Sequence, residues 1–486
     1  MGQDRHRRGS QDLQRPRRQR WPRAARTAGR GGPQLVRRDG RSRRAQVHHL
    51  LRHRLRRLGR QGLRAHCQSD HSCHAVGGVP LVPFFSEAAA DRPVANFARR
   101  VAHITANIGP AWLTLFASLG LALVGVHAID LGATAKPVGF LAPMAFKQAV
   151  YVGLGLLACV VMTLPRYRFL GAISWGLYAI IIASLVFLLL PFVPTWLVRP
   201  RNGARGWIDL GPFDLQPSEL AKIAWTLTIA WYLRFRANHR TLRGLLPPAI
   251  ITGVPVALIT LEPDLGNAAL FIPALFAILV AAGAKLKHLA LIVTIAAMAA
   301  PAAYPLLLPH QKARIIGMVL QAKGDASADQ DINMQSVTAQ RLVGAGQEAG
   351  VGASRTRTLV HFNALPEREN DMVFAVVANR FGFLGGLTLI GLYVAWIVGA
   401  IWTAGLCREP FGRLVPVGLA AFVSVQAFIN IGMNLGLLPI IGITLPFVSQ
   451  GGSSEITMWV MTGLILSIAA RRPHAMLRHS FEYDDD

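Results

Sequence analysis

The chain has 486 residues, of which 52% are hydrophobic and only 16% are charged, whereas a soluble globular domain carries about 25% charged residues. The net charge of +26 is typical of a nucleic-acid-binding protein, but residues 1–64 alone hold 21 Arg, no Lys and three acids, so most of this charge is confined to one arm. Four Cys are too few for a disulfide scaffold in a chain of this length. These values exclude a soluble domain and a nucleic-acid partner, and they predict a multi-span membrane protein with a basic tail.

The first 85 residues differ in composition from the rest of the chain. Arg without Lys, interspersed with Gly, Pro and Gln, indicates a disordered arm, and a start site assigned too early in the gene explains the same composition equally well. The His and Cys side chains between His66 and His74 lack the paired spacing of a structural zinc site, so no metal is expected there. A juxtamembrane segment at 86–109 leads to the first apolar run.

Apolar runs follow one another from residue 111 to residue 470. A bilayer core about 30 Å thick needs roughly 20 apolar residues per helix, and buried helices of a soluble core would explain one or two such runs but not a long series. We therefore predict an all-α polytopic bundle of about ten transmembrane helices in a domain covering 110–472. The predicted spans lie near 111–129, 148–164, 169–192, 220–233, 246–261, 268–282, 289–308, 373–406, 414–438 and 456–470.

Lys and Arg beside the spans predict their orientation, because basic residues in short loops resist translocation. With ten spans, the basic connections fall on the side of the Arg-rich N-terminus, which predicts that both termini and the tail at 473–486 are cytoplasmic. The opposite face receives a long outer loop at 309–372, between helices 7 and 8. Two outer loops also contain basic residues, which we expect to have a task there: Arg199, Arg201 and Arg205 in one, and Lys312, Arg314, Lys323, Arg341, Arg355, Arg357 and Arg368 in the other.

The first polar motif covers residues 201–222, where the fourth predicted span begins. Glu219 and Lys222 are three residues apart and share a helix face, so they either neutralise each other inside the bundle or line a polar cavity that binds a ligand. Arg205 carries a guanidinium that suits bidentate binding of phosphate, and Arg201 is a second candidate. Trp207 is either an interfacial anchor or part of the same binding site.

The second motif is Glu262-Pro263-Asp264, between two predicted spans. Asp264 either stabilises the positive end of a helix dipole, or it acts together with Glu262 to coordinate a cation or to orient a neighbouring base.

The third motif covers residues 365–375, where the long outer loop becomes a helix. Asp371 is the last acid before an apolar run, and Glu367 is a further candidate for substrate binding. Asp371 is either an N-terminal helix cap or a base whose proton affinity is raised by partial desolvation. In the second case it could accept a proton from a sugar hydroxyl.

The fourth motif lies between the last two predicted spans and is dense in small residues and Pro. Such a stretch forms a non-helical loop that must be buried in protein or line a water-filled cavity. Consecutive backbone amides at the start of the last span are a reasonable anion cradle, although packing explains the glycines about as well. The candidate residues are Ser449, Gly451, Gly452 and Ser453.

The four motifs read GARGWIDLGPFDLQPSELAK, EPDLGNA, LPERENDMVFAV and NIGMNLGLLPIIGITLPFVSQGGSS. In order and spacing they resemble the SEDS family (shape, elongation, division and sporulation), which includes FtsW, RodA and SpoVE, with a slight lean to FtsW. The resemblance runs from about residue 111 to residue 472. It implies ten transmembrane helices in the bacterial cytoplasmic membrane with both termini in the cytoplasm, which agrees with the spans counted above.

The resemblance also implies an activity and site residues. Members of this family polymerise the glycan strands of peptidoglycan from lipid II, an undecaprenyl-diphosphate-linked precursor, and work with a class B penicillin-binding protein. The family's essential aspartate corresponds to Asp371, and the glutamate and lysine of its QPSELAK motif correspond to Glu219 and Lys222. Its arginine and tryptophan correspond to Arg205 and Trp207, although one glycine here separates residues that are usually adjacent.

Glycosyl transfer from a lipid diphosphate needs a base for the acceptor hydroxyl and positive charge for the departing diphosphate. Asp371 is the predicted general base of an inverting transfer that forms β-1,4 bonds, and Arg205, Lys222 and Arg201 are the predicted diphosphate ligands. We expect them to face one another in one cleft. No tightly bound cofactor is expected, but a divalent cation, Mg²⁺ or Mn²⁺, near Glu262 or its neighbouring aspartate could assist.

The sequence departs from the family near Asp371. Glu369-Asn370 stands in place of His-Thr, and Asn379-Arg380 in place of a usual pair of Glu. Two other functions therefore stay open: a lipid II flippase, which needs a polar path that crosses to the inner face, and a scaffold for a penicillin-binding protein with reduced catalysis. Ionisable groups crowd toward the outer ends of the predicted spans, which favours the enzyme. The Gly-rich segment of the family's long loop is represented only by Gly344, Gly346, Gly350 and Gly352.

Overall fold

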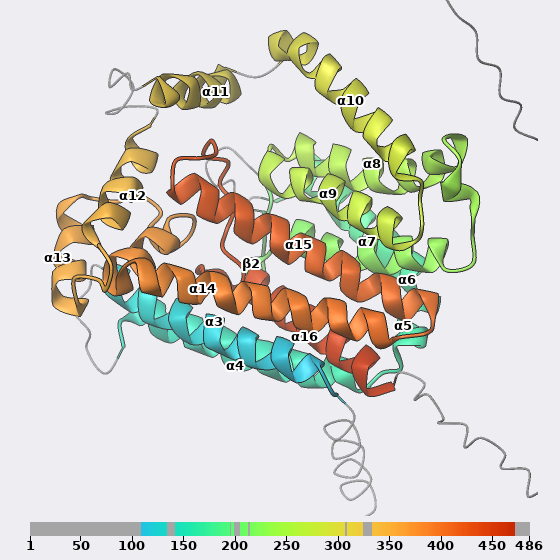
Figure 1. Cartoon of the computed structure of the whole chain (residues 1–486), viewed down its shortest axis with the longest axis horizontal. Coiled ribbons are helices and arrows are strands. Elements are labelled where there is room, and N and C mark those ends of the chain that lie inside the picture. Colours follow the sequence, from blue (N-terminus) through green and yellow to red (C-terminus); the bar gives the residue numbers. More distant parts are fainter. Residues whose placement is uncertain are drawn as a thin grey trace, which may run out of the picture. The chain divides into compact units, whose positions relative to one another are not determined.

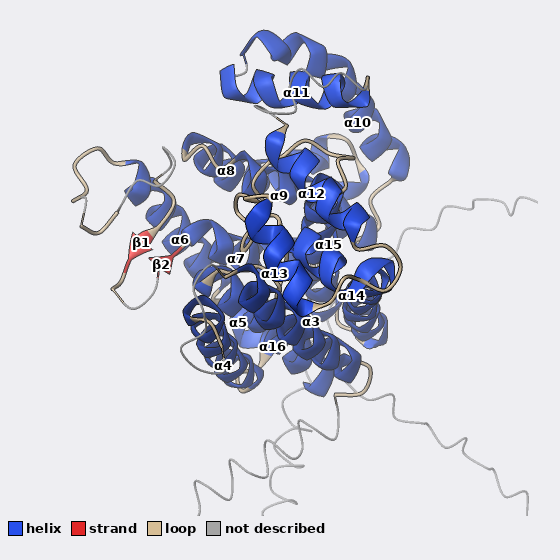
Figure 2. Ribbon diagram, turned by 90° about the vertical axis from the view of Figure 1, so that its left-hand side faces the viewer, coloured by secondary structure: helices blue, strands red, loops and turns tan. Residues whose placement is uncertain are grey.

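The computed structural model describes residues 108–133, 141–194, 196–198, 205–211, 214–306, 309–323 and 333–471. The described part is a bundle of α-helices with one short β-hairpin (Figure 1, Figure 2). Several sequence predictions lie outside the described residues: the arm at 1–85, most of the segment at 86–109, the tail at 473–486, the residues between His66 and His74, and Arg201.

A helix covers each predicted apolar span, so the all-α prediction is confirmed. The third predicted span is divided into two helices at Ile173. In chain order the helices and strands are α3 (Ala111–Gly132), α4 (Pro143–Thr163), α5 (Tyr167–Ala172), α6 (Ser174–Leu189), β1 (Ile208–Asp209), β2 (Asp214–Leu215), α7 (Pro217–Leu233), η2 (Asn238–Arg240), η3 (Arg243–Leu245), α8 (Leu246–Leu261), α9 (Leu265–Ala281), α10 (Leu286–Ala303), η4 (Tyr304–Leu306), α11 (Pro309–Ala322), α12 (Met334–Ala345), α13 (Ala353–Phe362), α14 (Val373–Leu406), α15 (Pro410–Asn434) and α16 (Gly452–Arg471).

Six of these helices are long and apolar enough to cross a membrane. Three shorter apolar helices, Ser174–Leu189, Leu265–Ala281 and Leu286–Ala299, add to them. Their outward side chains are apolar and exposed, which fits a lipid environment because lipid tails are as apolar as Leu. The six are Ala111–Gly132, Pro143–Thr163, Arg243–Leu261, Val373–Leu406, Pro410–Asn434 and Gly452–Arg471.

The core joins segments that are far apart in the sequence. Helix α14 packs along α3 and α15, and α16 packs along α4 (Figure 1). Trp225 of α7, Phe271 of α9 and Phe422 of α15 meet edge to face, with ring centroids 5.1–5.5 Å apart. Edge-to-face aromatic pairs add to the stabilisation that burial provides, so this cluster fixes α7, α9 and α15 relative to one another below the polar motifs.

The predicted long outer loop is largely helical, since α11, α12 and α13 lie within it. The 34 residues of α14, which follow the loop, are interrupted at Gly382, where φ is 69° and ψ is −162°. The amides of Phe383 and Leu384 donate to the carbonyls of Gln347 and Glu348 in the loop. A side chain on Gly382 would approach the Glu348 carbonyl to 2.4 Å, so the contact requires glycine.

Two of the predicted Gly-rich residues pack against the same interruption. A Cβ on Gly346 would lie 2.2 Å from the Ala378 carbonyl, and one on Gly350 would lie 2.1 Å from the Arg380 carbonyl. Gly346 and Gly350 therefore allow a close backbone approach of the long loop to α14 next to the interruption at Gly382.

Candidate active site

Asp371 lies in the turn before α14, one residue ahead of the N-cap residue Met372. No side chain makes a capping hydrogen bond at this helix end, so the capping alternative for Asp371 is wrong. Its side chain is partly exposed, and among the described residues its carboxylate has neither a hydrogen bond nor an ion pair. A carboxylate in this situation is available to accept a proton from a ligand.

The backbone of Asp371 is held by two amides of α15. The Nδ2 atoms of Asn430 and Asn434 each donate to the Asp371 carbonyl oxygen at 2.9 Å. Both Asn side chains are fully buried, and Asn434 Oδ1 also accepts a hydrogen bond from the amide of Ala375, at 3.2 Å. Buried amides whose donors and acceptors are both used specify one arrangement, so the turn is fixed while the carboxylate stays free.

The segment after α15 holds the two preceding residues of the same turn. Ser449 Oγ donates to the Asn370 carbonyl at 2.5 Å and accepts from the amide of Leu445 at 2.7 Å. The amide of Gln450 donates to the Glu369 carbonyl at 2.8 Å. The carbonyls of residues 369–371 thus all accept hydrogen bonds from residues of the fourth motif. Ser449 therefore has a positioning role, in addition to its predicted role in anion binding.

The surroundings of Asp371 favour its protonated form. The pKa of Asp371 is raised to about 7: burial contributes most, the carboxylate of Glu367 adds to the increase, the guanidinium of Arg314 opposes it, and Asp264 adds a smaller increase. Gly442 faces the carboxylate, because a Cβ on it would lie 3.5 Å from Asp371 Oδ2. A base with a pKa near the working pH combines the correct protonation state with useful basicity.

The Glu219–Lys222 pair that the spacing allows is formed. Lys222 Nζ donates to Glu219 Oε1 at 2.8 Å and to Gln426 Oε1 at 3.1 Å, and the exposed fractions of the two charged side chains are 2% and 0%. Pro217 occupies the first turn of α7, where a missing amide hydrogen costs nothing. With α7 beginning at Pro217, the side chains of Glu219 and Lys222 are buried inside the bundle, where Lys222 contacts Gln426 of α15.

Arg205 and Trp207 precede the hairpin of β1 and β2, which pair antiparallel with Ile208 opposite Leu215 (Figure 2). Arg205 is exposed and Trp207 is partly buried. Neither Arg205 nor Lys222 forms a hydrogen bond or an ion pair with Asp371 within the described residues. The expected shared cleft of these cations with Asp371 therefore stays a prediction.

The two carboxylates of the second motif have different surroundings. Asp264 is the N-cap of α9: its Oδ1 accepts from the amide of Asn267 at 3.0 Å, as the helix-dipole alternative required. Its Oδ2 accepts from Asn267 Nδ2 at 2.8 Å and from Gln216 Nε2 at 3.2 Å. Glu262 is 1% exposed, and neither of its carboxylate oxygens has a hydrogen-bond partner. Burial, followed by the charge of Asp264, raises the pKa of Glu262 to about 8.

Protein groups contact three residues of the predicted anion cradle at the start of α16. The amide of Gly451 donates to Gln148 Oε1 at 3.3 Å, and Gly452 lies so close to Tyr151 that a Cβ would be 2.8 Å from its ring. Ser453 Oγ accepts from the amide of Gln216 at 3.0 Å. These contacts favour the packing alternative for the glycines and connect the fourth motif to the first.

Hydrogen bonds thus link all four motifs into one polar region. Among the described residues, however, no three His, Cys, Asp or Glu side chains converge in a way that could hold a metal ion.

Several polar residues of this region were missed by the sequence interpretation. Gln148 Nε2 donates to Glu455 Oε2 at 3.1 Å, and Trp459 Nε1 donates to Glu455 Oε1 at 2.7 Å. The sequence did contain a signal for Gln148 and Glu455. Polar side chains within or next to apolar spans are energetically costly to bury, so they are expected to have polar partners. Asn430 and Asn434 carried a second signal, since a spacing of four places them on one helix face.

Comparison with known proteins identifies a family. Residues 110–474 match the model of the FtsW/RodA/SpoVE cell cycle protein family. The chain is 34% identical over 364 residues to a probable peptidoglycan glycosyltransferase FtsW of Thioalkalivibrio sulfidiphilus, covering 73% of this chain and 88% of that protein. It is 31% identical over 331 residues to the peptidoglycan glycosyltransferase MrdB of Escherichia coli, covering 68% and 86%.

Solved structures agree with the sequence matches. A structure showing how polymerization and crosslinking are coordinated in a peptidoglycan synthase complex aligns with a TM-score of 0.62 and 29% identity, covering 74% of this chain and 97% of that one. The rod shape determining protein RodA of Thermus thermophilus aligns with a TM-score of 0.54 and 26% identity over the same shares. The resemblance read from the four motifs is confirmed, and the chain belongs to the FtsW/RodA/SpoVE family of cell cycle proteins.

Proposed function

We propose that this chain is a peptidoglycan glycosyltransferase that polymerises lipid II into β-1,4 glycan strands for cell division or cell-shape maintenance. The observation that carries the proposal is the Asp371 turn: its backbone is bound by buried side chains, while its carboxylate is free and has a pKa raised to about 7. The names of the related glycosyltransferases support the reaction class.

In the proposed reaction Asp371 accepts the proton of the 4-hydroxyl of an acceptor GlcNAc as this oxygen attacks the anomeric carbon of the donor MurNAc. The bond to the lipid diphosphate breaks on the opposite face of the sugar, so the α-linked donor becomes a β-linked product. Arg205 is the preferred diphosphate ligand because it is exposed. Lys222 donates hydrogen bonds to Glu219 and Gln426. The double variant Glu219→Gln with Lys222→Met tests whether it also binds the diphosphate.

We further propose that the protein lies in the bacterial cytoplasmic membrane with both termini in the cytoplasm, and works with a class B penicillin-binding protein. The alignment with a subunit of a peptidoglycan synthase complex supports such a partner. The alternate basic loops support the orientation, because positive residues are retained on the cytoplasmic side.

The deciding experiment incubates the purified full-length protein with labelled lipid II, with and without its penicillin-binding partner. We expect polymer that grows with time. Absence of polymer from the wild-type protein, together with movement of lipid II across vesicle membranes, would instead identify a flippase. Absence of both activities would leave a scaffold.

Polymerisation is expected to rise as the pH increases through about 7, because Asp371 must be deprotonated to accept the hydroxyl proton. Initial rates between about pH 5.5 and 8.5 would measure this profile. Glu367→Gln removes a negative charge that raises the pKa of Asp371, so its midpoint should move to lower pH. A rate that does not change across this range contradicts Asp371 as the base.

The second motif is the candidate site for a divalent cation, Mg²⁺ or Mn²⁺. Glu262 offers two buried oxygens without partners, and Asp264, two residues away, would bind the cation through oxygens that otherwise accept hydrogen bonds from Asn267 and Gln216. Mg²⁺ is commonly held by one or two carboxylates together with substrate phosphates. We propose that these two residues would hold the cation, which would supply positive charge for the diphosphate.

Thermal unfolding tests the cation proposal. The folded protein retains a proton on Glu262 up to about pH 8, whereas the unfolded chain loses it near the ordinary value of 4.5, so stability should fall as the pH rises between these values. Glu262→Gln should flatten this decline. In the wild-type protein Mg²⁺ should also flatten the decline of stability with pH, because it stabilises the charged form of Glu262. In Glu262→Gln, Mg²⁺ should leave the slope unchanged. Equal slopes with and without Mg²⁺ in the wild-type protein contradict the proposed cation site.

A further inference from the structure

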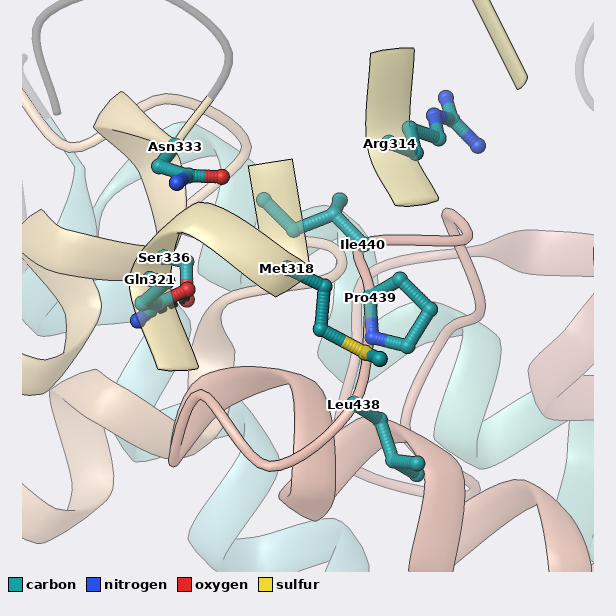
Figure 3. Close-up of a pocket in the computed structure, with 8 residues that line it drawn as sticks. All are labelled: Arg314, Met318, Gln321, Asn333, Ser336, Leu438, Pro439 and Ile440. Atoms are coloured by element: carbon teal, nitrogen blue, oxygen red, sulfur yellow. Dashed lines mark hydrogen bonds between the residues drawn. The ribbon is translucent and has the colours of Figure 1, made fainter. Parts of the chain in front are cut away.

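The segment between α15 and α16, residues 435–451, has different neighbours at its two ends. Near its beginning, residues 438–440 and residues of α11 line a cavity of about 20 Å³ (Figure 3), which has room for about one water molecule. At its other end, the Ser449 hydroxyl and the Gln450 amide donate to backbone carbonyls of the Asp371 turn. The position of that turn therefore depends on what holds this second end of the segment.

The buried side chain of Gln148 in α4 binds the segment on both sides of Gln450. Gln148 Nε2 donates to the Ser449 carbonyl at 3.3 Å, and Gln148 Oε1 accepts from the Gly451 amide at 3.3 Å. The Ser449 carbonyl and the Gln450 amide belong to one planar peptide group. By holding that carbonyl, Gln148 orients the N–H group that donates to the Glu369 carbonyl at 2.8 Å.

Glu455 in the first turn of α16 holds the Gln148 amide in turn. Its Oε2 accepts from Gln148 Nε2 at 3.1 Å, and its Oε1 accepts from Trp459 Nε1 at 2.7 Å. Trp459 packs so closely on α4 that a Cβ on Gly155 would lie 2.2 Å from its ring. The Glu455 side chain is 1% exposed, and burying a carboxyl group is costly unless its oxygens are hydrogen-bonded. Both oxygens are bound here, so this acid has one defined position.

We propose that Gln148 and Glu455 are positioning residues of glycosyl transfer, which place the Asp371 turn relative to α4 and α16 through Ser449 and Gln450. The inference rests on the proposed function. The two residues hold the backbone of the turn, whereas the Asp371 carboxylate stays free to accept a proton. A base that moves by about 1 Å can lose about 100-fold in rate, so the effect of losing this pair should exceed its effect on stability.

The first readout is the kinetics of polymerisation with labelled lipid II. Gln148→Leu and Glu455→Leu should each lower kcat about tenfold or more with a much smaller change in KM, because a misplaced base affects the transition state more than substrate binding. Glu455→Gln should have a smaller effect, since its single oxygen can replace only one of the two acceptors. This milder variant also keeps the test decisive if a Leu variant does not fold.

The matched control is Thr252→Val in α8. Thr252 Oγ1 accepts from Trp225 Nε1 at 3.0 Å and donates to the Pro248 carbonyl at 2.8 Å. Its replacement removes the buried acceptor of an indole N–H, as Glu455→Leu does for Trp459, but at a site that does not hold the turn. Thr252→Val should lower the melting temperature by a similar amount and keep kcat within a few-fold of wild type.

Hydrogen exchange provides a readout that does not need activity. In the full-length protein in detergent, peptides that contain Gln450 and Gly451 should exchange about tenfold faster in Gln148→Leu and in Glu455→Leu than in wild type, as expected for the loss of one good hydrogen bond. The same peptides should exchange at the wild-type rate in Thr252→Val. Mass spectrometry of these peptides measures the change.

The outcomes separate this inference from the proposed function. Wild-type kcat in Gln148→Leu and in both Glu455 variants overturns the positioning role. A fall in kcat no larger than that of Thr252→Val at the same loss of melting temperature overturns it as well, because the pair would then be structural only. If the wild-type protein forms no polymer, the proposed function fails. Faster exchange in the Leu variants would then still support the hold on the turn, and unchanged exchange would overturn it.

Discussion

Asp371→Asn is expected to reduce polymerisation of lipid II by about 100-fold or more, because a positioned general base contributes roughly 10²–10⁴ to the rate. The substitution keeps the shape of the side chain and leaves the backbone carbonyl that binds Asn430 and Asn434 in place. It removes the negative charge and with it the capacity to take up a proton. The measurement is the initial rate of polymer formation from labelled lipid II, with the partner protein present.

The matched control is Glu369→Gln in the same turn. Glu369 pairs with Arg368 at 3.5 Å through its side chain, whereas the contact with Gln450 uses its backbone carbonyl and persists in the variant. This control should polymerise within a few-fold of wild type. Both variants should keep the wild-type melting temperature and bind the partner. Normal polymerisation by Asp371→Asn would show that the base is another group, even though the family assignment would stand.

Lys222→Met is expected to destabilise the protein by about 3–5 kcal/mol, because it leaves the Glu219 carboxylate buried without its partner. Glu219 Oε2 already lacks a hydrogen bond and Gln426 Oε1 would lose a donor, so no nearby group can replace the ammonium. Thermal unfolding in detergent should show a lower melting temperature and, through the displaced α7, weaker polymerisation.

The double variant Glu219→Gln with Lys222→Met separates stability from chemistry. It removes both buried charges and should recover most of the melting temperature, because a neutral pair avoids the cost of an unpaired charge. If Lys222 contacts the diphosphate, the double variant should be stable but should polymerise poorly. Near wild-type polymerisation would show that the pair is structural and that the predicted diphosphate role of Lys222 is wrong. A double variant as unstable as Lys222→Met would contradict the electrostatic explanation of the destabilisation.

Much of the fold could be predicted because it depends on local properties. Six of the described helices are apolar runs long enough to cross a membrane, and run length follows directly from the order of residues. The start of α7 at Pro217 follows from proline chemistry, and the pairing of Glu219 with Lys222 follows from helical spacing. The position of Asp371 at the beginning of an apolar run marked it as a candidate base for the same reason.

The remaining features depend on contacts between distant segments. The capping alternative for Asp371 was excluded only when Met372 proved to be the N-cap. The interruption of α14 at Gly382 exists because loop residues 347–348 accept the amides that the break releases. A continuous apolar run of 34 residues gives no sign of such a partner, which lies in another segment.

The sequence by itself determined that this is a helical membrane protein, which family it belongs to, and which acid stands at the boundary of the eighth span. Only the tertiary structure decided how that acid is held. Asn430, Asn434 and Ser449 bind carbonyls of residues 370 and 371 from 59 to 79 positions away in the chain. Every residue has the same backbone carbonyl, so the sequence does not indicate which carbonyl a side chain will bind. These partners are known only once the chain has folded.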